Sequence, residues 1–291
     1  MKADARKLCT ITMILLLLLL QACTFRSLIL NYTDTFLISE IESALEPISD
    51  KQEEIIKKQV NIFWKNMRCI YIKDMEKDFE KINTIITTGI TEQSIETLKL
   101  IIKKWRNTLF TKSIDLLAKL KPSLKEAQIS TLKRKFVERT DEIKETLNLD
   151  PDEYQEVRKE KILENFETFY GQATEQQQTR LFLIYGLNRS REEIRLENRK
   201  YFNDFFINTL VNAKGSKELN SGFADWINNP AIAIPPAKRA AYLRFRNTWY
   251  QRLITTDRLI TKQQRLHLIN FISELKQDLL KQVLPTSECK S

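Results

Sequence analysis

Residue types that commonly perform chemistry are scarce in this chain of 291 residues, and their spacing supports no catalytic site. His267 is the only histidine, so a Ser-His-Asp triad would have to use it, and no Gly-x-Ser-x-Gly turn is present to hold a nucleophile. Cys69, Cys289 and His267 lack the spacing of zinc ligands. We therefore expect a histidine on a helix surface, no bound metal and no cofactor.

Carboxylates are plentiful, so counting alone does not exclude a glycosidase that uses two acids. All-helical enzymes that cut peptidoglycan, however, carry a cleft rich in glycine and aromatic residues, and the five glycines of this chain do not form one. We expect a protein that is not an enzyme. A peptidoglycan-active enzyme is the less favoured alternative.

Basic residues concentrate between Lys99 and Arg139, where twelve lysines and arginines accompany three acidic residues. This stretch has a net charge of +9, equal to that of the whole chain. It would attract an anionic lipid, lipopolysaccharide or an acidic protein client, whereas the alternative is a helix face that is simply solvated. The candidate binding residues are Lys99, Lys103, Lys104, Arg106, Lys133, Arg134 and Lys135.

A second cationic segment, 242–252, mixes arginines with aromatic residues. Aromatic rings beside guanidinium groups bind acyl headgroups, sugars or unfolded chains. The same residues at helical spacing also describe a core stripe with arginines on its flank, and this second reading is favoured. The residues are Tyr242, Arg244, Phe245, Arg246, Trp249, Tyr250 and Arg252.

The first 22 residues have the form of an export signal. Lys2, Arg6 and Lys7 precede an apolar run over 8–20, which would span about 20 Å as a helix, whereas a bilayer core is about 30 Å thick. A permanent transmembrane helix is therefore the disfavoured alternative. The predicted mature chain begins at Cys23.

The residues Leu20-Gln21-Ala22-Cys23 resemble the lipobox of bacterial lipoproteins. The resemblance implies cleavage before Cys23 and attachment of three acyl chains such as palmitate to that residue, which anchor a protein to a membrane essentially permanently. Thr24 follows, where an aspartate would favour the inner membrane, so we expect an outer-membrane lipoprotein that faces the periplasm. Nucleic acid is then not an expected partner.

Two cysteines, Cys69 and Cys289, remain in the mature chain beside Cys23. In an oxidising compartment they could form a disulfide that closes a loop of about 220 residues. The alternative, which is weighted slightly higher, is two unpaired thiols.

The composition and the apolar spacing both predict an all-α fold. Glycine and proline are few, and apolar residues recur at three and four positions over 49–89, 95–122, 132–147, 150–171 and 174–212. Short turns make neighbouring helices antiparallel. We expect an elongated array of long antiparallel helices and helical hairpins.

The positions of glycine and proline, together with the changes in composition, predict five segments. These are a signal peptide at 1–22, an N-terminal helical body at 23–213, an irregular connection rich in glycine and proline at 214–236, a C-terminal helical hairpin at 237–284 and a disordered tail at 285–291.

Five short stretches look alike and predict helix starts through the capping box, in which a hydroxyl and a glutamine satisfy two backbone N–H groups. They do not recur at a fixed period, so a regular solenoid is not indicated. The stretches are Ile48–Gln52, Ile90–Ser94, Leu124–Gln128, Ala173–Gln177 and Ile260–Gln264.

These starts, the lipobox, the run Asn31-Tyr-Thr-Asp34 and the closing pattern from Trp249 to Leu275 resemble an uncharacterised family of proteobacterial lipoproteins with repeated Leu-Thr-x-x-Gln helix starts. The family has no assigned activity, so only the lipidated Cys23 is carried over. The Leu-Thr-x-x-Gln element is also similar to that of small periplasmic stress chaperones.

We therefore expect a membrane-anchored periplasmic lipoprotein that acts by non-catalytic binding, chaperone-like or scaffold-like, of an envelope client. The main alternative is a structural envelope lipoprotein without a client. The sequence does not indicate the oligomeric state.

Overall fold

The computed structural model describes residues 34–289, and every regular element in this range is helical. The all-α prediction is confirmed. The α-helices are α3 (Asp34–Ala44), α4 (Asp50–Asn66), α5 (Ile72–Thr88), α6 (Glu92–Leu120), α7 (Glu126–Asn148), α8 (Pro151–Tyr170), α9 (Glu175–Tyr185), α10 (Ser190–Asn212), α11 (Ser216–Asn228), α12 (Arg239–Leu259), α13 (Lys262–Leu280) and α14 (Thr286–Cys289). A π-helical turn, η1 (Met67–Tyr71), and three 3-10 turns, η2 (Lys121–Ser123), η3 (Pro230–Ala233) and η4 (Pro236–Lys238), complete the set.

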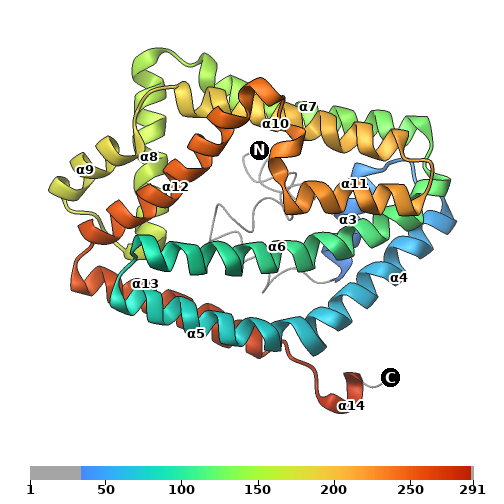
Figure 1. Ribbon diagram of the computed structural model, residues 1–291, viewed down its shortest axis with the longest axis horizontal. Coiled ribbons are helices and arrows are strands. Elements are labelled where there is room, and N and C mark those ends of the chain that lie inside the picture. Colours follow the sequence, from blue (N-terminus) through green and yellow to red (C-terminus); the bar gives the residue numbers. More distant parts are fainter. Residues whose placement is uncertain (1–33, 290–291) are drawn as a thin grey trace.

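Helices that follow one another in the chain mostly pack against other partners. α5 packs mainly against α13, α6 against α11, and α7 against α10. In Figure 1, α5 and α13 lie along one edge of the molecule, α7 and α10 lie along the opposite edge, and α8 joins the two edges at one end. Within 34–289, no helix combines the length and the apolar character needed to cross a bilayer.

The first long helix begins and ends where the sequence predicts. Ser49 caps α4, and Gly89, with a φ of +97°, ends α5. Between α4 and α5 the helix passes through the π-helical turn η1, and Figure 1 shows a bend there. The extra residue in a π turn re-aims the helix, so α4 and α5 present their apolar faces to different neighbours.

The helix expected over 174–212 is two helices. α9 ends at Gly186, whose φ of +72° is a left-handed conformation that side chains with a Cβ rarely adopt. The chain then turns over four residues before α10 begins at Ser190. A single glycine within a periodic apolar pattern is too weak a signal to place this break from the sequence.

The segment 214–236, expected to be an irregular connection, contains the thirteen-residue helix α11. Leu219, Phe223 and Ile227 lie one helical turn apart and are buried against α6, α7 and α10. Gly222 allows the close approach of α10, because a Cβ there would lie 2.9 Å from Thr209 Cγ2. Burial of one apolar face therefore outweighs the helix-breaking residues on either side.

The two helices of 237–284 pack on different partners. α12 packs against α9 and α10, whereas α13 packs against α5 and α8. Figure 1 shows α12 crossing the molecule while α13 follows α5 along the edge. Both helices are therefore built into the body formed by the earlier part of the chain. In the segment expected to be a disordered tail, the short helix α14 covers Thr286–Cys289.

Apolar side chains form several separate clusters. The largest joins α6, α7, α10 and α11, another joins α5, α8, α9 and α13, and a third joins η1, α5, α6 and α13. A chain with long helices and few turns distributes its core in this way because each helix buries a narrow stripe against successive neighbours.

Four of the five predicted helix starts meet in two pairs, through their glutamines. The side-chain amides of Gln52 and Gln128 hydrogen bond reciprocally, with each Nε2 lying 3.0 Å from the other residue's Oε1. The same arrangement joins Gln177 and Gln264, at 2.7 and 3.0 Å. All four side chains are buried.

Each paired amide has all its hydrogen-bonding groups occupied. The Oε1 atom also accepts the backbone N–H of its own cap, for example Thr174 N at 3.1 Å and Thr261 N at 2.9 Å. The Nε2 atom also donates to the carbonyl five residues before the partner glutamine, which is Leu259 O for Gln177 and Gln172 O for Gln264. Ser123 O and Pro47 O play this part in the other pair.

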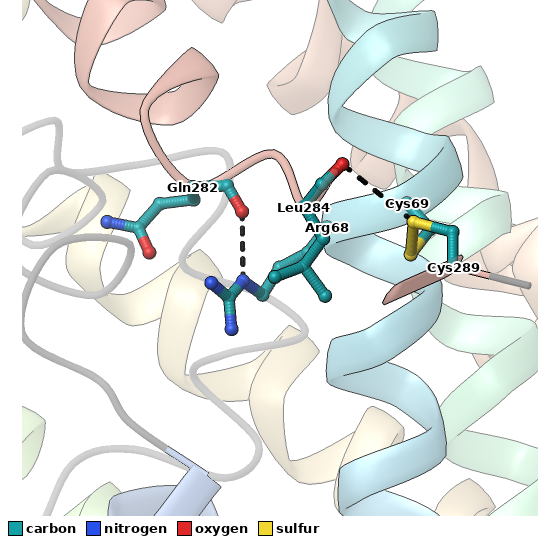
Figure 2. Close-up of a disulfide and its surroundings, with 5 residues drawn as sticks. All are labelled: Arg68, Cys69, Gln282, Leu284 and Cys289. Atoms are coloured by element: carbon teal, nitrogen blue, oxygen red, sulfur yellow. Dashed lines mark hydrogen bonds between the residues drawn. A yellow bond between two sulfur atoms is a disulfide. The ribbon is translucent and has the colours of Figure 1, made fainter. Parts of the chain in front are cut away.

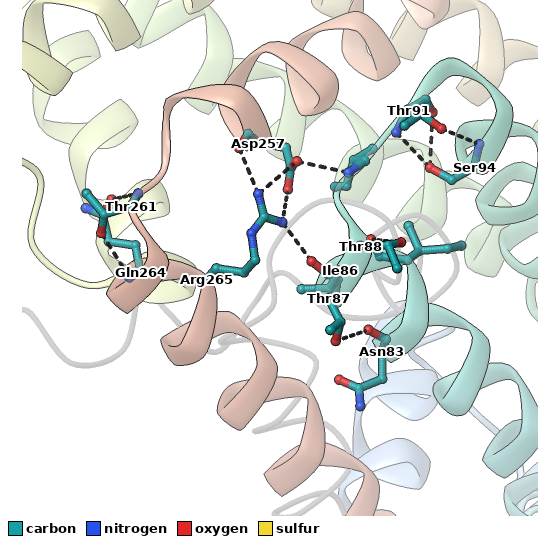
Figure 3. A network of polar contacts seen from close by, with 12 residues as sticks. Asn83, Ile86, Thr87, Thr88, Thr91, Ser94, Asp257, Thr261, Gln264 and Arg265 are labelled. Atoms are coloured by element: carbon teal, nitrogen blue, oxygen red, sulfur yellow. Dashed lines mark hydrogen bonds and ion pairs between the residues drawn. The ribbon is translucent and has the colours of Figure 1, made fainter.

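The fifth start, at Thr91, has a serine in place of the glutamine and is joined to its neighbours by an ion pair instead. Ser94 completes a local cap with Thr91, and the preceding residue Ile90 donates its N–H to Asp257 Oδ2 at 2.9 Å. Arg265 bonds Asp257 Oδ1 at 2.7 Å and also donates to Ile86 O at 2.7 Å. Figure 3 shows this network joining the α5–α6 turn to α12 and α13.

Candidate functional site

Three of the predicted binding residues line one side of α6. Lys99, Lys103 and Arg106 are spaced four and three residues apart, so they project from the same side of the helix. That side faces α12, because the Lys99 Nζ atom lies 4.8 Å from the ring centroid of Tyr250. The set of six residues formed by these three and by Tyr242, Arg246 and Tyr250 of α12 is named the α6–α12 seam.

The α12 side of the seam combines a buried and a half-buried tyrosine ring with a guanidinium group. Tyr242, Arg246 and Tyr250 are each four residues apart, and Arg246 Cζ lies 5.7 Å from the centroid of the Tyr242 ring. Tyr242 is buried and packs edge-on against Phe202. Tyr242 therefore belongs to the core and Arg246 flanks it, as the core-stripe interpretation of segment 242–252 expects, whereas binding by this segment stays a prediction.

Burial and like charge act together on Arg106. Its pKa is lowered from 12.5, first because the guanidinium is partly removed from water and then because Arg246 is near. Its Nε atom is buried and has no hydrogen-bond partner among the described residues. Burial raises the pKa of Tyr242, so its hydroxyl stays protonated at neutral pH. Arg106 and Arg246 therefore give this part of the seam positive charge, and neither forms an ion pair with a carboxylate of the described residues.

One end of the seam is hollowed and mixed in charge. A depression of about 260 Å³ is bordered by Glu92, Lys99, Tyr250 and Gln251. Glu96 also borders it and accepts a hydrogen bond of 2.6 Å from Lys99 Nζ. This end can receive a side chain or a small polar group, and the strongly cationic part lies further along α6.

Lys104 is directed away from the seam. Its Nζ atom forms an ion pair of 2.8 Å with Asp78, and the Trp105 indole N–H donates to the same carboxylate oxygen at 2.8 Å. Asp78 is buried, so these two donors satisfy a carboxylate between α5 and α6. We assign Lys104 a structural part in joining these helices.

The basic residues of α7 lie apart from those of α6. Lys133 and Arg134 are exposed, and Arg134 is paired with Glu138 at 2.6 Å; Lys135 is half-buried. α6 and α7 share a core cluster through the part of α6 that begins at Phe110. The structure thus divides the basic stretch into two surfaces, of which the α6 part carries the aromatic neighbours.

The sulfur atoms of Cys69 and Cys289 are bonded at 2.07 Å, so the pairing that the sequence left open is present in the structure. The bond joins α14 to the π-helical turn η1, and Figure 2 shows the tail lying across that helix. Two backbone contacts reinforce it: Arg68 Nε donates to Gln282 O at 2.9 Å, and the N–H of Leu284 donates to Arg68 O at 3.2 Å.

The remaining candidate residues are placed as follows. Cys23, the predicted lipidation site, lies outside the described residues. His267 is exposed on α13, beside Gly171. Within 34–289, no group of three or more histidine, cysteine or acidic side chains is arranged to hold a metal ion.

The sequence profile of one protein family, described as "Family of unknown function (DUF6279)", matches residues 48–239, about two thirds of the chain. The matched range runs from the turn before α4 to the first residue of α12 and includes the paired starts at Gln52 and Gln128. No curated protein and no solved structure matches the chain.

Proposed function

Because the chain belongs to DUF6279, a family of unknown function, we propose its function from its own residues: a lipid-anchored protein of the cell envelope that binds a client without catalysing a reaction. Acyl chains on Cys23 would hold it at a membrane, with the outer membrane and a periplasmic orientation favoured by Thr24. The client is anionic: a lipid, lipopolysaccharide or an acidic polypeptide.

The α6–α12 seam is the observation that carries this proposal. It places the cations Lys103, Arg106 and Arg246 along two helices, and the ring of Tyr242 lies beside Arg246. Cations beside aromatic faces bind anionic groups that carry apolar parts, since the ring contacts the apolar part while the cation binds the charge. The Arg106 Nε atom is buried and has no partner among the described residues, so an acceptor group of a client would complete its hydrogen bonding.

Exposed leucines beside the seam add apolar surface on both helices. Leu100 is 68% exposed and lies one turn from Lys103, and Leu243 is 47% exposed and lies one turn from Arg246. Isolated exposed leucines are common, but each of these two lies one helical turn from a cation of the seam. The combination favours an amphipathic client, such as a lipid or an unfolded polypeptide, over a small inorganic anion.

A chaperone-like or scaffold-like role follows from such a surface, because a mixed cationic and apolar surface binds by charge and contact rather than by shape. The main alternative is a structural envelope lipoprotein that has no client. A peptidoglycan-active enzyme remains the third candidate, and release of sugar fragments from peptidoglycan by the purified protein would favour it over binding.

In-cell crosslinking tests the proposal. A photoreactive amino acid replaces Lys103 in the seam, and the same amino acid replaces Lys262, an exposed residue at the start of α13, as the control. Irradiation of intact cells should give a discrete crosslinked species from position 103 and not from position 262. If neither position captures a species, or if both capture the same one, the seam is not the binding surface.

Purified components test the mechanism of capture. The double variant Lys103→Gln/Arg246→Gln should bind the captured client at least about tenfold more weakly, whereas Arg258→Gln/Lys262→Gln, which removes the same charge from exposed positions, should bind as wild type. Wild-type binding should weaken as salt rises from about 0.05 to about 0.5 M, because the Debye length falls well below about 10 Å over this range. Binding that is insensitive to salt would contradict electrostatic capture.

A further inference from the structure

Two arginines from two helices contact the end of α9, and their charges act on a third arginine, which lies on another helix. Arg158 lies on α8, Arg191 on α10 and Arg252 on α12. Two of them cap the helix: Arg252 Nε donates to Ile184 O at 2.9 Å, and Arg158 Nε donates to Gly186 O at 3.4 Å. Cations commonly satisfy the last carbonyl groups of a helix, so these two bonds by themselves are a structural feature.

The capping bonds leave most of the guanidinium donors unused. The Arg252 guanidinium lies 5.6 Å from the ring centroid of Tyr185 and makes no other hydrogen bond among the described residues. The Arg158 side chain is only 10% exposed; its Nη1 lies 3.8 Å from Glu192 Oε1, and its Nη2 is buried without a partner. Buried donors of this kind are destabilising unless another group accepts from them.

No interaction among the described residues explains why Arg191 is partly buried at this position. It is half-buried, and among the described residues it forms no hydrogen bond and no ion pair. Burial, followed by the charges of Arg252 and Arg158, lowers its pKa to about 10. Glu192 offsets only part of this effect. A third arginine that caps nothing is therefore held, at a cost in stability, beside two that do.

The cluster holds fewer negative than positive charges. Glu192 is the carboxylate within it, and this residue is already bonded to Arg195 at 3.0 Å. Even if Arg195 is left out, three guanidinium groups against one carboxylate leave two positive charges. Residues that evolve only for packing do not usually concentrate like charges in a partly buried place, because the repulsion and the desolvation both oppose folding.

We propose that Arg158, Arg191 and Arg252 form a binding site for a phosphate-bearing ligand. A phosphate group carries up to two negative charges and three terminal oxygens, so it would neutralise the cluster and accept from all three guanidinium groups. A carboxylate has one charge and two oxygens, and it would leave one positive charge and one guanidinium without a partner. This site is separate from the α6–α12 seam and goes beyond the proposed function.

Inorganic phosphate tests the site directly. The full-length chain in detergent is titrated by calorimetry with sodium phosphate, and with sodium chloride at matched ionic strength. Phosphate should bind to wild type, and Arg191→Met should bind it at least about tenfold more weakly. Arg244→Met, which removes an exposed arginine from α12, should bind as wild type. No binding beyond that of chloride, or equal binding by Arg191→Met, would overturn the proposal.

A second substitution separates the site from a folding defect. Arg191→Lys keeps the charge but loses the planar fork, so it should bind phosphate with an affinity between those of wild type and Arg191→Met. Circular dichroism should show the same helix content in all of these variants. Equal loss of binding in Arg244→Met would assign the effect to net charge and overturn the site.

The source of the phosphate is resolved by a water-soluble, short-chain phosphatidic acid used in the same titration. Binding at least about tenfold tighter than that of inorganic phosphate, and sensitive to Arg191→Met, identifies a lipid headgroup as the ligand. Equal or weaker binding that is still sensitive to Arg191→Met identifies a soluble phosphate. Both results support the site, whereas insensitivity of both ligands to Arg191→Met removes it.

Discussion

The side chains of Gln177 and Gln264 hydrogen bond to one another in both directions, at 2.7 and 3.0 Å, although 87 residues separate them in the chain. Gln52 and Gln128 are related in the same way. In both pairs each glutamine also caps its own helix, so the same side chain stabilises a helix start and a contact between distant parts of the chain. At these four positions the repeated helix start therefore also connects two turns that are distant in the sequence.

Replacing one member of a pair should be costly. Gln264→Leu removes both bonds to the buried amide of Gln177 and leaves the carbonyl of Gln172 and the N–H of Thr261 without their partner, so we expect a loss of about 2–4 kcal/mol in the free energy of unfolding. Urea denaturation measures this loss. The double variant Gln177→Leu/Gln264→Leu should lose less than the sum of the two single variants, because the bonds between the two amides contribute to both single losses. Additive losses would show that the two amides act independently.

The start at Thr91 provides a matched control, since its cap is exposed and has no partner glutamine. Ser94→Ala removes only a local cap, so we expect a loss of about 1 kcal/mol or less in urea denaturation. A loss as large as that of Gln264→Leu would mean that the local cap, and not the pairing, explains the cost at both starts.

The ion pair of Asp257 with Arg265 should be the most sensitive contact at the α5–α6 turn. Asp257 is buried, and Arg265 bonds its carboxylate while also capping α5 through Ile86 O. Arg265→Met leaves a buried carboxylate without its counter-charge, for which we expect a loss of about 3–5 kcal/mol. Thermal and urea denaturation measure it. Arg258→Met, a neighbouring exposed arginine, should change stability by less than about 0.5 kcal/mol.

Many of the helix starts are predictable from local signals, whereas the hydrogen-bonded pairing of their glutamines is not. Ser49, Thr174 and Thr261 head capping boxes as their spacing indicates, because a cap depends only on residues three positions apart. The pairing of their glutamines depends on which turns meet in space, and no feature of a single stretch encodes this. The break at Gly186 and the full length of α11 are not evident from the sequence for a related reason, because burial against distant helices decides them.

The spatial grouping of the candidate binding residues is likewise not predictable from the sequence. The basic stretch is evident from composition, but the separation of Lys103 from Lys133 follows from the packing of α6 and α7 on different helices. Arg246 stands in the segment 242–252, where the arginine and aromatic spacing is visible. The cluster around Arg191 has no sequence signal, because its three arginines come from three distant helices.

The disulfide should contribute substantially to stability. Cys69 and Cys289 close a loop of 220 residues and hold α14 against η1. Cys289→Ser should lower the free energy of unfolding by about 2–4 kcal/mol relative to the oxidised wild type. The same loss should follow reduction of the wild type, and reductant should not affect the variant. Mass spectrometry of the unreduced protein tests the bond itself, and two free thiols would contradict it.

Arg191 should lower stability in the absence of ligand. Its pKa of about 10 lies below the ordinary 12.5, so the folded state disfavours the charged form. The full penalty applies below pH 10, declines as pH rises towards 12.5 and is absent above it. Arg191→Met should therefore raise the free energy of unfolding at pH 7, by on the order of 1 kcal/mol. A clear loss of stability in this variant would instead assign Arg191 a structural task.

The proposed attachment of lipid to Cys23 would determine where the protein is located and which clients it can meet, so its measurement is the most direct test of the proposed function. Cells are grown with a palmitate analogue that can be labelled after lysis, and the full-length wild type is compared with Cys23→Ser. The wild type should carry the label and sediment with membranes, and Cys23→Ser should lack the label and remain unprocessed. An unlabelled wild type, or label and processing that are unchanged in Cys23→Ser, would contradict the lipid anchor.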